Sequence, residues 1–252
     1  MRQEKLRIAS YNIRKARGLD QKVLPGRTLD VINGLEADIV VLQEADRRLG
    51  KRPPAVPRAM IESETDFSLV DLSANGISLG WHGNAVLVRD ASKVRATAQL
   101  DLPGFEPRGA VVVDLDVGAG LRLVGAHLGL RRRDRLDQLA VLRRAASDTG
   151  ATVIAGDFNE WSETRGLEPL AGHFDTYAPG RSFHARRPIA GLDRFALSAD
   201  AELRDSGVEE GPLARRASDH LPIWSDIELA TGAPQSGVGD KSWTRPHNIS
   251  SS

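Results

Sequence analysis

Short apolar segments rich in β-branched residues recur along the chain and predict strands. The most pronounced is 153–155 within TVIAGDFN, where Gly156 predicts a sharp turn after a buried strand. The run of short strands between 67 and 128 predicts an antiparallel meander. The remaining apolar patterns complete a set of predicted strands at 6–13, 39–42, 67–72, 84–89, 94–102, 110–117, 121–128, 192–198, 201–208 and 222–229.

Apolar residues at helical spacing predict helices between these strands. Residues 131–147 give the clearest pattern, with Leu136, Leu139, Leu142 and Arg143 spaced along one buried stripe. Shorter patterns predict helices over 28–35 and 164–170, whereas polar segments rich in Gly or Pro predict loops over 14–26, 45–58 and 209–217. Strands that alternate with helices favour an α/β fold.

Composition limits the classes of protein that remain. A chain of 252 residues can bury one large core, and its 34 basic and 34 acidic residues cancel, so no global field attracts nucleic acid or anionic lipid. Without cysteine there are no disulfides or thiolate metal sites. No signal peptide or transmembrane segment is evident, and we expect a cytoplasmic monomer. Residues 1–230 are predicted to form the domain, and the Gly- and Ser-rich residues 231–252 a disordered tail.

Polar side chains suited to phosphate chemistry follow nearly every predicted buried strand. One such residue alone is more often structural, but a random surface would not place them so regularly at strand ends. In an α/β sheet, groups beyond the carboxyl ends of strands meet where ligands bind. The residues are Asn12, Glu44, His127, Asp157, Asn159, Asp193, Asp219 and His220.

These residue types provide the parts needed to hydrolyse a phosphodiester. Glu44, with Asn12 and Asp219, offers the oxygen ligands that Mg²⁺ or Mn²⁺ prefers. His220 is the candidate general base, with Asp193 or Asp157 holding its tautomer. The other candidates serve the phosphate or water: His127 as a donor to phosphate oxygen and Asn159 as an orienting amide.

Eight short motifs follow one another in an order that resembles the endonuclease/exonuclease/phosphatase superfamily. This group includes DNase I-like nucleases, apurinic endonucleases, inositol polyphosphate phosphatases and neutral sphingomyelinases. The resemblance covers about residues 6–229, essentially the whole predicted domain. The motifs are YNI (11–13), LQE (42–44), GNAVLVR (83–89), PRGA (107–110), AHL (126–128), GDFN (156–159), LDRF (192–195) and SDH (218–220).

The resemblance implies a four-layer α/β/β/α sandwich of the DNase I-like type, with two mixed sheets face to face and helices outside. It also implies metal-dependent cleavage of phosphoesters. Glu44 would be the principal metal ligand with Asn12 beside it, and Asp219 would support the metal or the base. Asp157 and Asn159 would serve the nucleophile and the phosphate. His220 would be the base, oriented by Asp193, and His127 matches the nuclease and sphingomyelinase pattern.

The substrate is predicted only as a phosphodiester of nucleic acid, a lipid headgroup or a small metabolite. Asn84 stands where DNase I-like enzymes carry a glutamate that orients the first histidine, and we expect Asn84 near the substrate. Arg14 and Arg108 could bind substrate phosphate or be solvated or paired. The basic cluster 131–133 begins a helix and is predicted to be a solvated face.

Other functions remain open at this point. A phosphatase or a phospholipid phosphodiesterase of the same family would use the same residues. A catalytically silent binding module would be expected to lack Glu44 or the SDH motif, and both are present. The segment 76–80, GISLG, matches the nucleophile elbow of serine hydrolases, but the motif requires a strand before it and a helix after it.

Overall fold

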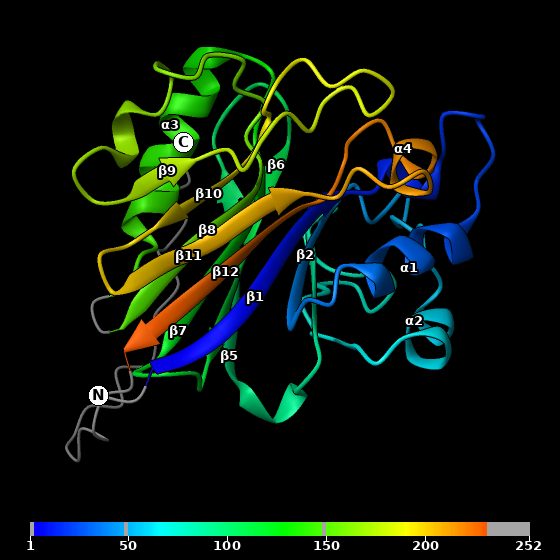
Figure 1. The fold of residues 1–252 in the computed structure, drawn as a ribbon, viewed down its shortest axis with the longest axis horizontal. Helices are drawn as coiled ribbons and strands as arrows, with labels where there is room; N and C mark the ends of the chain where they lie inside the picture. The colour runs from blue at the N-terminus through cyan, green and yellow to red at the C-terminus, as the bar shows by residue number, and fades with distance from the viewer. Residues whose placement is uncertain (1–2, 48–49, 148–149, 231–252) are drawn as a thin grey trace, which may run out of the picture.

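The computed structural model describes residues 3–47, 50–147 and 150–230, which form two mixed six-stranded sheets packed face to face (Figure 1). The predicted tail 231–252 lies outside the described residues. The first sheet has the order β11 (Ala201–Val208), β12 (Ile223–Ala230), β1 (Gln3–Asn12), β2 (Ile39–Gln43), β4 (Ala85–Val88) and β3 (Ser68–Leu69). The second has the order β5 (Val94–Leu102), β6 (Arg108–Leu115), β7 (Leu121–His127), β8 (Ala151–Asp157), β10 (Asp193–Leu197) and β9 (Asp175–Tyr177).

Helices cover the outer faces of both sheets and complete the four layers that the resemblance implies. The first sheet carries α1 (Pro25–Gly34), α2 (Arg58–Glu64) and the single turn α4 (Ala214–Ala217), and the second carries α3 (Arg132–Arg144). Three-residue 3₁₀ turns lie at Arg14–Ala16, Ala91–Lys93 and Glu168–Leu170. In the part of the chain that the structure describes, no helix is long and apolar enough to cross a membrane.

Three hydrophobic clusters explain why the strands read as continuous apolar runs. Ile8 and Val153 belong to the cluster between the sheets. Ala9, the neighbour of Ile8, faces the other way and packs with Leu29 beneath α1 and α2. Ile154, the neighbour of Val153, packs beneath α3. Because successive side chains of a strand point to opposite faces, a strand with two covered faces must be apolar throughout.

The predicted meander between 67 and 128 is wrong as one continuous unit. The strand β3 pairs antiparallel with β4, and β5, β6 and β7 pair antiparallel in turn. The chain crosses from the first sheet to the second between β4 and β5, so the two groups lie in different sheets. A period of two residues predicts a strand but carries no information on its partner.

Gly156 does not form the predicted turn, because β8 continues through it to Asp157. Its φ is +152°, and a Cβ atom there would lie 1.9 Å from the carbonyl oxygen of Ala126 on the parallel neighbour β7. Gly156 is therefore a site of close backbone approach within a strand.

Helix predictions differ from the structure mainly at glycines and at helix faces. The helix predicted over 164–170 is reduced to a 3₁₀ turn because Gly166 has a φ of +89°, which no α-helix accommodates. The loop predicted over 209–217 ends in α4, whose Ala214 and Ala217 pack into the core. The helix α3 buries Arg135 and Gln138 beside Leu139 and Leu142, while the predicted Leu136 is only partly covered. The elements α2 and β9 were not predicted.

Candidate active site

Strand register brings three predicted site residues together at one edge of the second sheet. His127 and Asp157 are paired across the parallel strands β7 and β8. Asp193 is paired with Asp157 across the antiparallel strands β8 and β10. All three side chains are buried, and Asp157 is only 1% exposed. Two adjacent buried carboxylates raise the free energy of the folded state unless cationic or donor groups face them.

Both sheets supply those partners, so the Asp157 carboxylate lies where the two sheets meet. Asn12, at the end of β1, donates from Nδ2 to Asp157 Oδ2 at 3.0 Å. The Nε2 atoms of His127 and His220 lie 3.3 and 3.6 Å from the same oxygen. The other oxygen, Oδ1, accepts from the backbone N–H of Asn159 at 2.9 Å. Four groups from different segments therefore converge on one carboxylate.

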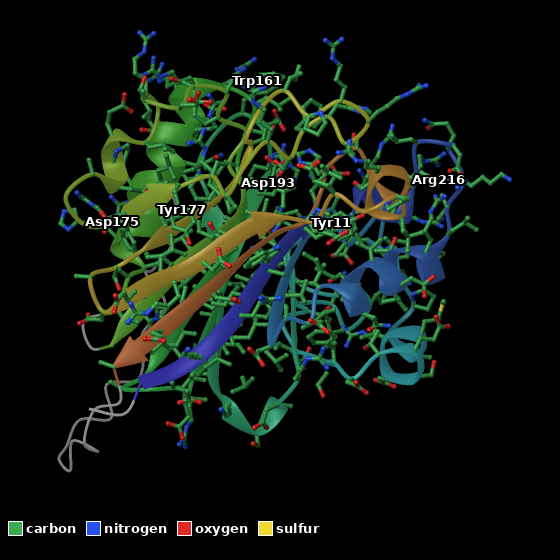
Figure 2. The ribbon with its side chains drawn as sticks, viewed as in Figure 1. Tyr11, Trp161, Asp175, Tyr177, Asp193 and Arg216 are labelled. Atoms are coloured by element: carbon green, nitrogen blue, oxygen red, sulfur yellow. The ribbon has the colours of Figure 1, made fainter. Side chains whose placement is uncertain are left out.

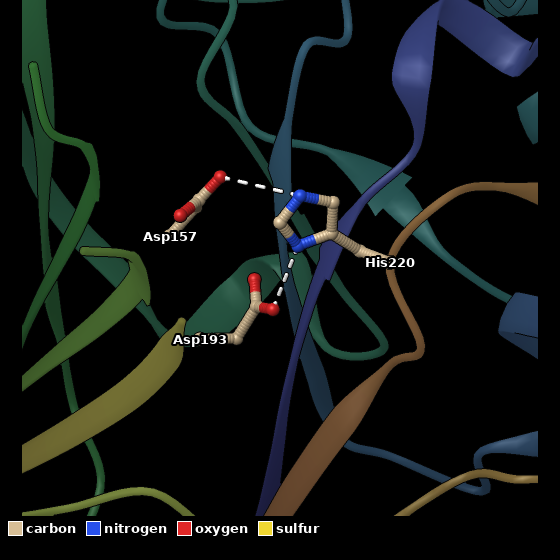
Figure 3. A group of neighbouring side chains, drawn as sticks. All are labelled: Asp157, Asp193 and His220. Carbon is tan, nitrogen blue, oxygen red and sulfur yellow. Dashed lines mark hydrogen bonds and ion pairs between the residues drawn. The ribbon is translucent and has the colours of Figure 1, made fainter. Parts of the chain in front are cut away.

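His220 lies between two carboxylates, as Figure 3 shows. Its Nδ1 is 2.8 Å from Asp193 Oδ2, which also accepts from the hydroxyl of Ser182. The Phe183 ring packs against the imidazole with centroids 4.9 Å apart. Burial opposes a charged imidazolium, but the negative charges of Asp193 and Asp157 outweigh it and raise the pKa of His220 to about 10. Asp157, Asp193 and His220 thus form a buried acid and imidazole group.

Asn159 is held in position by the backbone around it. Its φ is +50°, a left-handed conformation that asparagine tolerates better than most residues. Its Nδ2 donates to the carbonyl of Leu128 at 2.9 Å, which ties the loop after β8 to the loop after β7. The turn that places Asn159 therefore also positions the main chain beside His127.

The predicted metal ligands Glu44 and Asp219 line the same cleft as His220, with about a quarter of each side chain exposed. Each carboxylate faces a basic side chain: Lys15 pairs with Glu44, and Arg14 Nε is 3.3 Å from Asp219 Oδ2. These carboxylates, with the amide oxygen of Asn12, form an oxygen-rich donor set that fits a hard divalent cation. Because both carboxylates already face a basic side chain, this part of the cleft favours positive charge.

The cleft has a volume of about 220 Å³ and is mostly polar. It contains seven of the eight strand-end candidates, and Asp193 lies behind it, against His220. Its walls are Asn12, Lys15, Glu44, Asp46, Arg52, His82, Gly83, Glu106, Pro107, Arg108, His127, Leu130, Asp157, Asn159, Asp219 and His220.

The three predicted substrate-binding residues lie in different surroundings. Arg108 lines the cleft, pairs with Glu106 at 2.8 Å and is 8% exposed. Arg14 is outside the cleft walls and faces Asp219. Asn84 is fully buried, and its Nδ2 donates to the carbonyls of Trp81 and Gly109, at 3.1 and 2.9 Å. Asn84 thus contacts the backbone next to Arg108, and substrate binding by these residues stays a prediction.

Several cleft residues were not predicted from the sequence. Lys15 is the second residue after the YNI motif, and Arg52 lies in the long polar loop 45–58. His82 also lines the cleft, with its Nε2 3.8 Å from Asp101 Oδ1. A basic residue two positions after a strand-end motif was the available signal for Lys15, whereas nothing local distinguishes Arg52 from other surface arginines.

A buried ion pair behind the cleft joins the two loops that carry His127 and Asn159. Arg135 of α3 donates to Glu160 Oε2 at 2.7 Å and to the carbonyl of Leu130 at 2.6 Å. Arg194 of β10 donates to the carbonyl of Glu160 at 3.0 Å. Arg135 and Glu160 are 6% and 5% exposed. The pair therefore fixes the loop after β7 and the loop after β8 relative to α3.

Replacing Glu160 by glutamine should lower the free energy of unfolding and make that free energy less sensitive to acidic pH. Burial opposes ionisation, but donors from Ser162 and Arg135 outweigh it and lower the pKa of Glu160. Its contribution is therefore present above the unfolded pKa of about 4.5 and is lost as pH falls through the lower folded pKa. At pH 7 we expect a loss of about 1.5–3 kcal/mol, the value of a hydrogen bond to a charged group.

Urea unfolding at neutral and acidic pH measures this effect. The difference in free energy of unfolding between wild type and Glu160→Gln should become smaller as the pH is lowered. The exposed Glu163→Gln is the matched control, since Glu163 lies in the same loop. A difference that stays constant with pH would contradict a role for the ionised carboxylate.

The GISLG segment does not form a nucleophile elbow. Ser78 is 4% exposed, and its hydroxyl donates to the carbonyl of Gly80 at 2.8 Å. The segment leads into β4 instead of a helix. A serine hydrolase site at Ser78 is therefore excluded on geometry.

Comparison with known proteins agrees with this architecture. The uncharacterized protein YbhP of Escherichia coli K12 is 27% identical over 246 residues, covering 88% of this chain and 96% of YbhP. The solved endonuclease/exonuclease/phosphatase from Beutenbergia cavernae has a TM-score of 0.70 at 22% identity, covering 90% of this chain and 72% of that one. TDP2 of D. rerio, complexed with single strand DNA product, has a TM-score of 0.68 at 19% identity, covering 88% and 98%.

The family match extends along most of the chain. Residues 9–220 match the Endonuclease/Exonuclease/phosphatase family, a span that begins in β1 and ends at His220. It therefore includes strands of both sheets and all the residues that meet at Asp157. On this match, the chain belongs to the Endonuclease/Exonuclease/phosphatase family.

Proposed function

We propose that the protein is a divalent-metal-dependent phosphodiesterase in which His220 activates the attacking water. The observation that carries the proposal is the line Asp193, His220, Asp157, in which each imidazole nitrogen faces a carboxylate. His220 and Asp157 line a cleft that Glu44 and Asp219 also line. A base and oxygen ligands for a cation in one cleft are two requirements for hydrolysing a phosphate diester with water.

Each residue has a role that follows from its contacts. Asp193 holds Nδ1 of His220, which leaves Nε2 to accept a proton from water at the cleft. Asp157 lies 3.6 Å from Nε2, where its charge would stabilise the imidazolium that then forms, and it accepts a hydrogen bond from the amide of Asn12. His127 and Asn159 line the cleft and are suited to donate to phosphate oxygens. Arg108, buried at the cleft wall, supplies a fixed positive charge for the same anion.

The cation would be held by Glu44, Asn12 and Asp219, which face the cleft with oxygen atoms. When bound, Mg²⁺ or Mn²⁺ would neutralise phosphate charge and offset the carboxylate charge that raises the pKa of His220. Because a cation and Lys15 would compete for Glu44, the Lys15 side chain would have to move away. Residues 1–230 would form the whole catalytic domain.

Hydrolysis of bis-p-nitrophenyl phosphate, with p-nitrophenyl phosphate in parallel, tests the reaction class. We expect diester cleavage in Mg²⁺ or Mn²⁺ and none in EDTA. Cleavage of the monoester alone would make the protein a phosphatase. Absence of metal-dependent turnover on these esters and on natural diesters would overturn the proposal in favour of a silent binding module.

The variant Glu44→Gln tests the metal site separately. It removes the charge of the principal ligand, so the Mg²⁺ concentration for half-maximal rate should rise by at least the ~10–100-fold seen for outer-shell partners of metals. The exposed Glu36→Gln serves as the control. A Mg²⁺ dependence equal to that of wild type would place the cation elsewhere.

A further inference from the structure

The four most exposed large hydrophobic side chains of the described residues all lie on loops at the cleft edge of the second sheet. Phe105, Leu130, Trp161 and Ile189 are 58–75% exposed, while the other exposed large hydrophobic residues are 37–44% exposed. Scattered single residues of this kind are ordinary on a protein surface. Four such residues in one place are not ordinary, and the strand topology explains why these four lie together.

The loops leave the sheet from neighbouring strands at the same edge. Residues 103–107 connect β5 to β6, and the loops after β7 and β8 follow two parallel strands. The strand β10 is antiparallel to β8 and β9, so residues 178–192 return to this edge as well. Figure 2 shows Trp161 at this end of the molecule, above the level of Asp193 and Tyr11.

Direct contacts join these loops into a continuous rim. Arg131, next to Leu130, lies over the Phe105 ring at 4.2 Å. The ion pair behind the cleft connects the Leu130 loop to the segment that carries Trp161. The Trp161 and Phe183 rings are 5.9 Å apart. Finally, Ile189 donates its backbone N–H to the carbonyl of Phe183 at 2.7 Å.

The rim is also basic, although the whole chain is neutral. The carboxylates in these loops and the adjoining helix turns are Glu106, Asp134, Glu160, Glu163 and Glu168; Glu163 and Glu168 are exposed, and Glu168 pairs with Arg132. The exposed basic residues of the same segments are Arg131, Arg132, Arg133, Arg165, Arg181, Arg186 and Arg187. Exposed apolar tips surrounded by arginine match the headgroup region of an anionic bilayer, where apolar groups enter the lipid and cations meet phosphate.

We propose that this rim docks the protein on anionic phospholipid membranes, with Phe105, Leu130, Trp161 and Ile189 inserted at the interface. Single-stranded nucleic acid would also attract arginine, but it needs ring faces for stacking, and Leu130 and Ile189 have none. Docking in this orientation brings the cleft to the headgroup level. That the diester cleaved there is a phospholipid rests on the proposed function; docking does not.

Vesicle flotation in EDTA tests docking independently of catalysis. Wild type should bind vesicles of phosphatidylcholine with phosphatidylglycerol and bind phosphatidylcholine alone weakly. The double variant Phe105→Ser/Ile189→Ser should lose about tenfold in partition coefficient, and Arg186→Gln/Arg187→Gln should weaken binding mainly at low salt. The control Leu24→Ser/Leu213→Ser alters exposed leucines on the helical side of the first sheet and should bind as wild type.

The possible results separate docking from the proposed chemistry. No binding of wild type to anionic vesicles, or binding equal in the rim and control variants, would overturn the proposal. Binding of a single-stranded oligonucleotide that the rim variants lose, without vesicle binding, would assign the rim to nucleic acid. Hydrolysis of the soluble diester is measured without vesicles, so its failure would count against the proposed function alone.

Discussion

Replacing His220 by alanine is expected to lower kcat for diester hydrolysis by about 10³-fold, within the 10²–10⁴-fold range of general acid–base catalysis. The variant removes the ring that lies between Asp193 and Asp157. It also leaves two buried carboxylates without their cationic neighbour, so some loss of stability will accompany the loss of rate. Steady-state kinetics at saturating metal, on protein shown by circular dichroism to be folded, measures the effect.

Two further variants make this result specific. Asp193→Asn keeps the ring in place but weakens its orientation, so kcat should fall between those of wild type and His220→Ala. His173→Ala removes an exposed histidine far from the strand-end motifs and should behave as wild type. A loss of less than tenfold in His220→Ala would assign the base to another residue.

Replacing Gly156 by alanine is expected to destabilise the protein by about 3–5 kcal/mol, a large part of the stability of a typical domain. The added methyl group would meet a backbone oxygen of β7, which cannot move without breaking the parallel pairing of β7 and β8. A φ of +152° adds strain for any residue with a side chain. Urea unfolding followed by tryptophan fluorescence measures the change.

Gly34 provides the matched control for this substitution. It lies in α1 with no atom within 4 Å of an added Cβ atom. Gly34→Ala should therefore leave stability unchanged or raise it by up to about 1 kcal/mol, because alanine favours helix. If both variants unfold at the same urea concentration, the inference that β7 and β8 approach too closely at Gly156 to accept a side chain is wrong.

Local patterns predicted the strands well and their partners poorly. The run at 39–42 predicts β2 within one residue because both faces of the strand are covered and all its side chains must be apolar. Nothing in such a run identifies β1 as its parallel neighbour. The assignment of β4 and β5 to different sheets likewise depends on contacts between distant segments, and the ordered motifs supplied that information only through the family resemblance.

The candidate site was predictable where a residue ends a strand. Asp157 and His127 follow apolar runs directly, and the strand register then makes them neighbours. Arg135 and Glu160 gave no such signal, because a charged residue on a helix or in a loop is normally solvated. Each is buried because it pairs with the other, and the two lie 25 residues apart in the chain. A local sequence pattern does not contain that pairing.

The pairing of β1 with β12 joins the first and the last strand of the described residues, from Gln3 opposite Ala230 to Ser10 opposite Ile223. Asn12 ends β1, and His220 lies three residues before β12, so both depend on this pairing to reach Asp157. During synthesis on the ribosome, β12 emerges after every other strand that the structure describes, and the sheet containing β1 cannot close before it does. The proposed hydrolytic activity should therefore appear only after β12 has emerged, and the long sequence separation of these strands predicts slow folding.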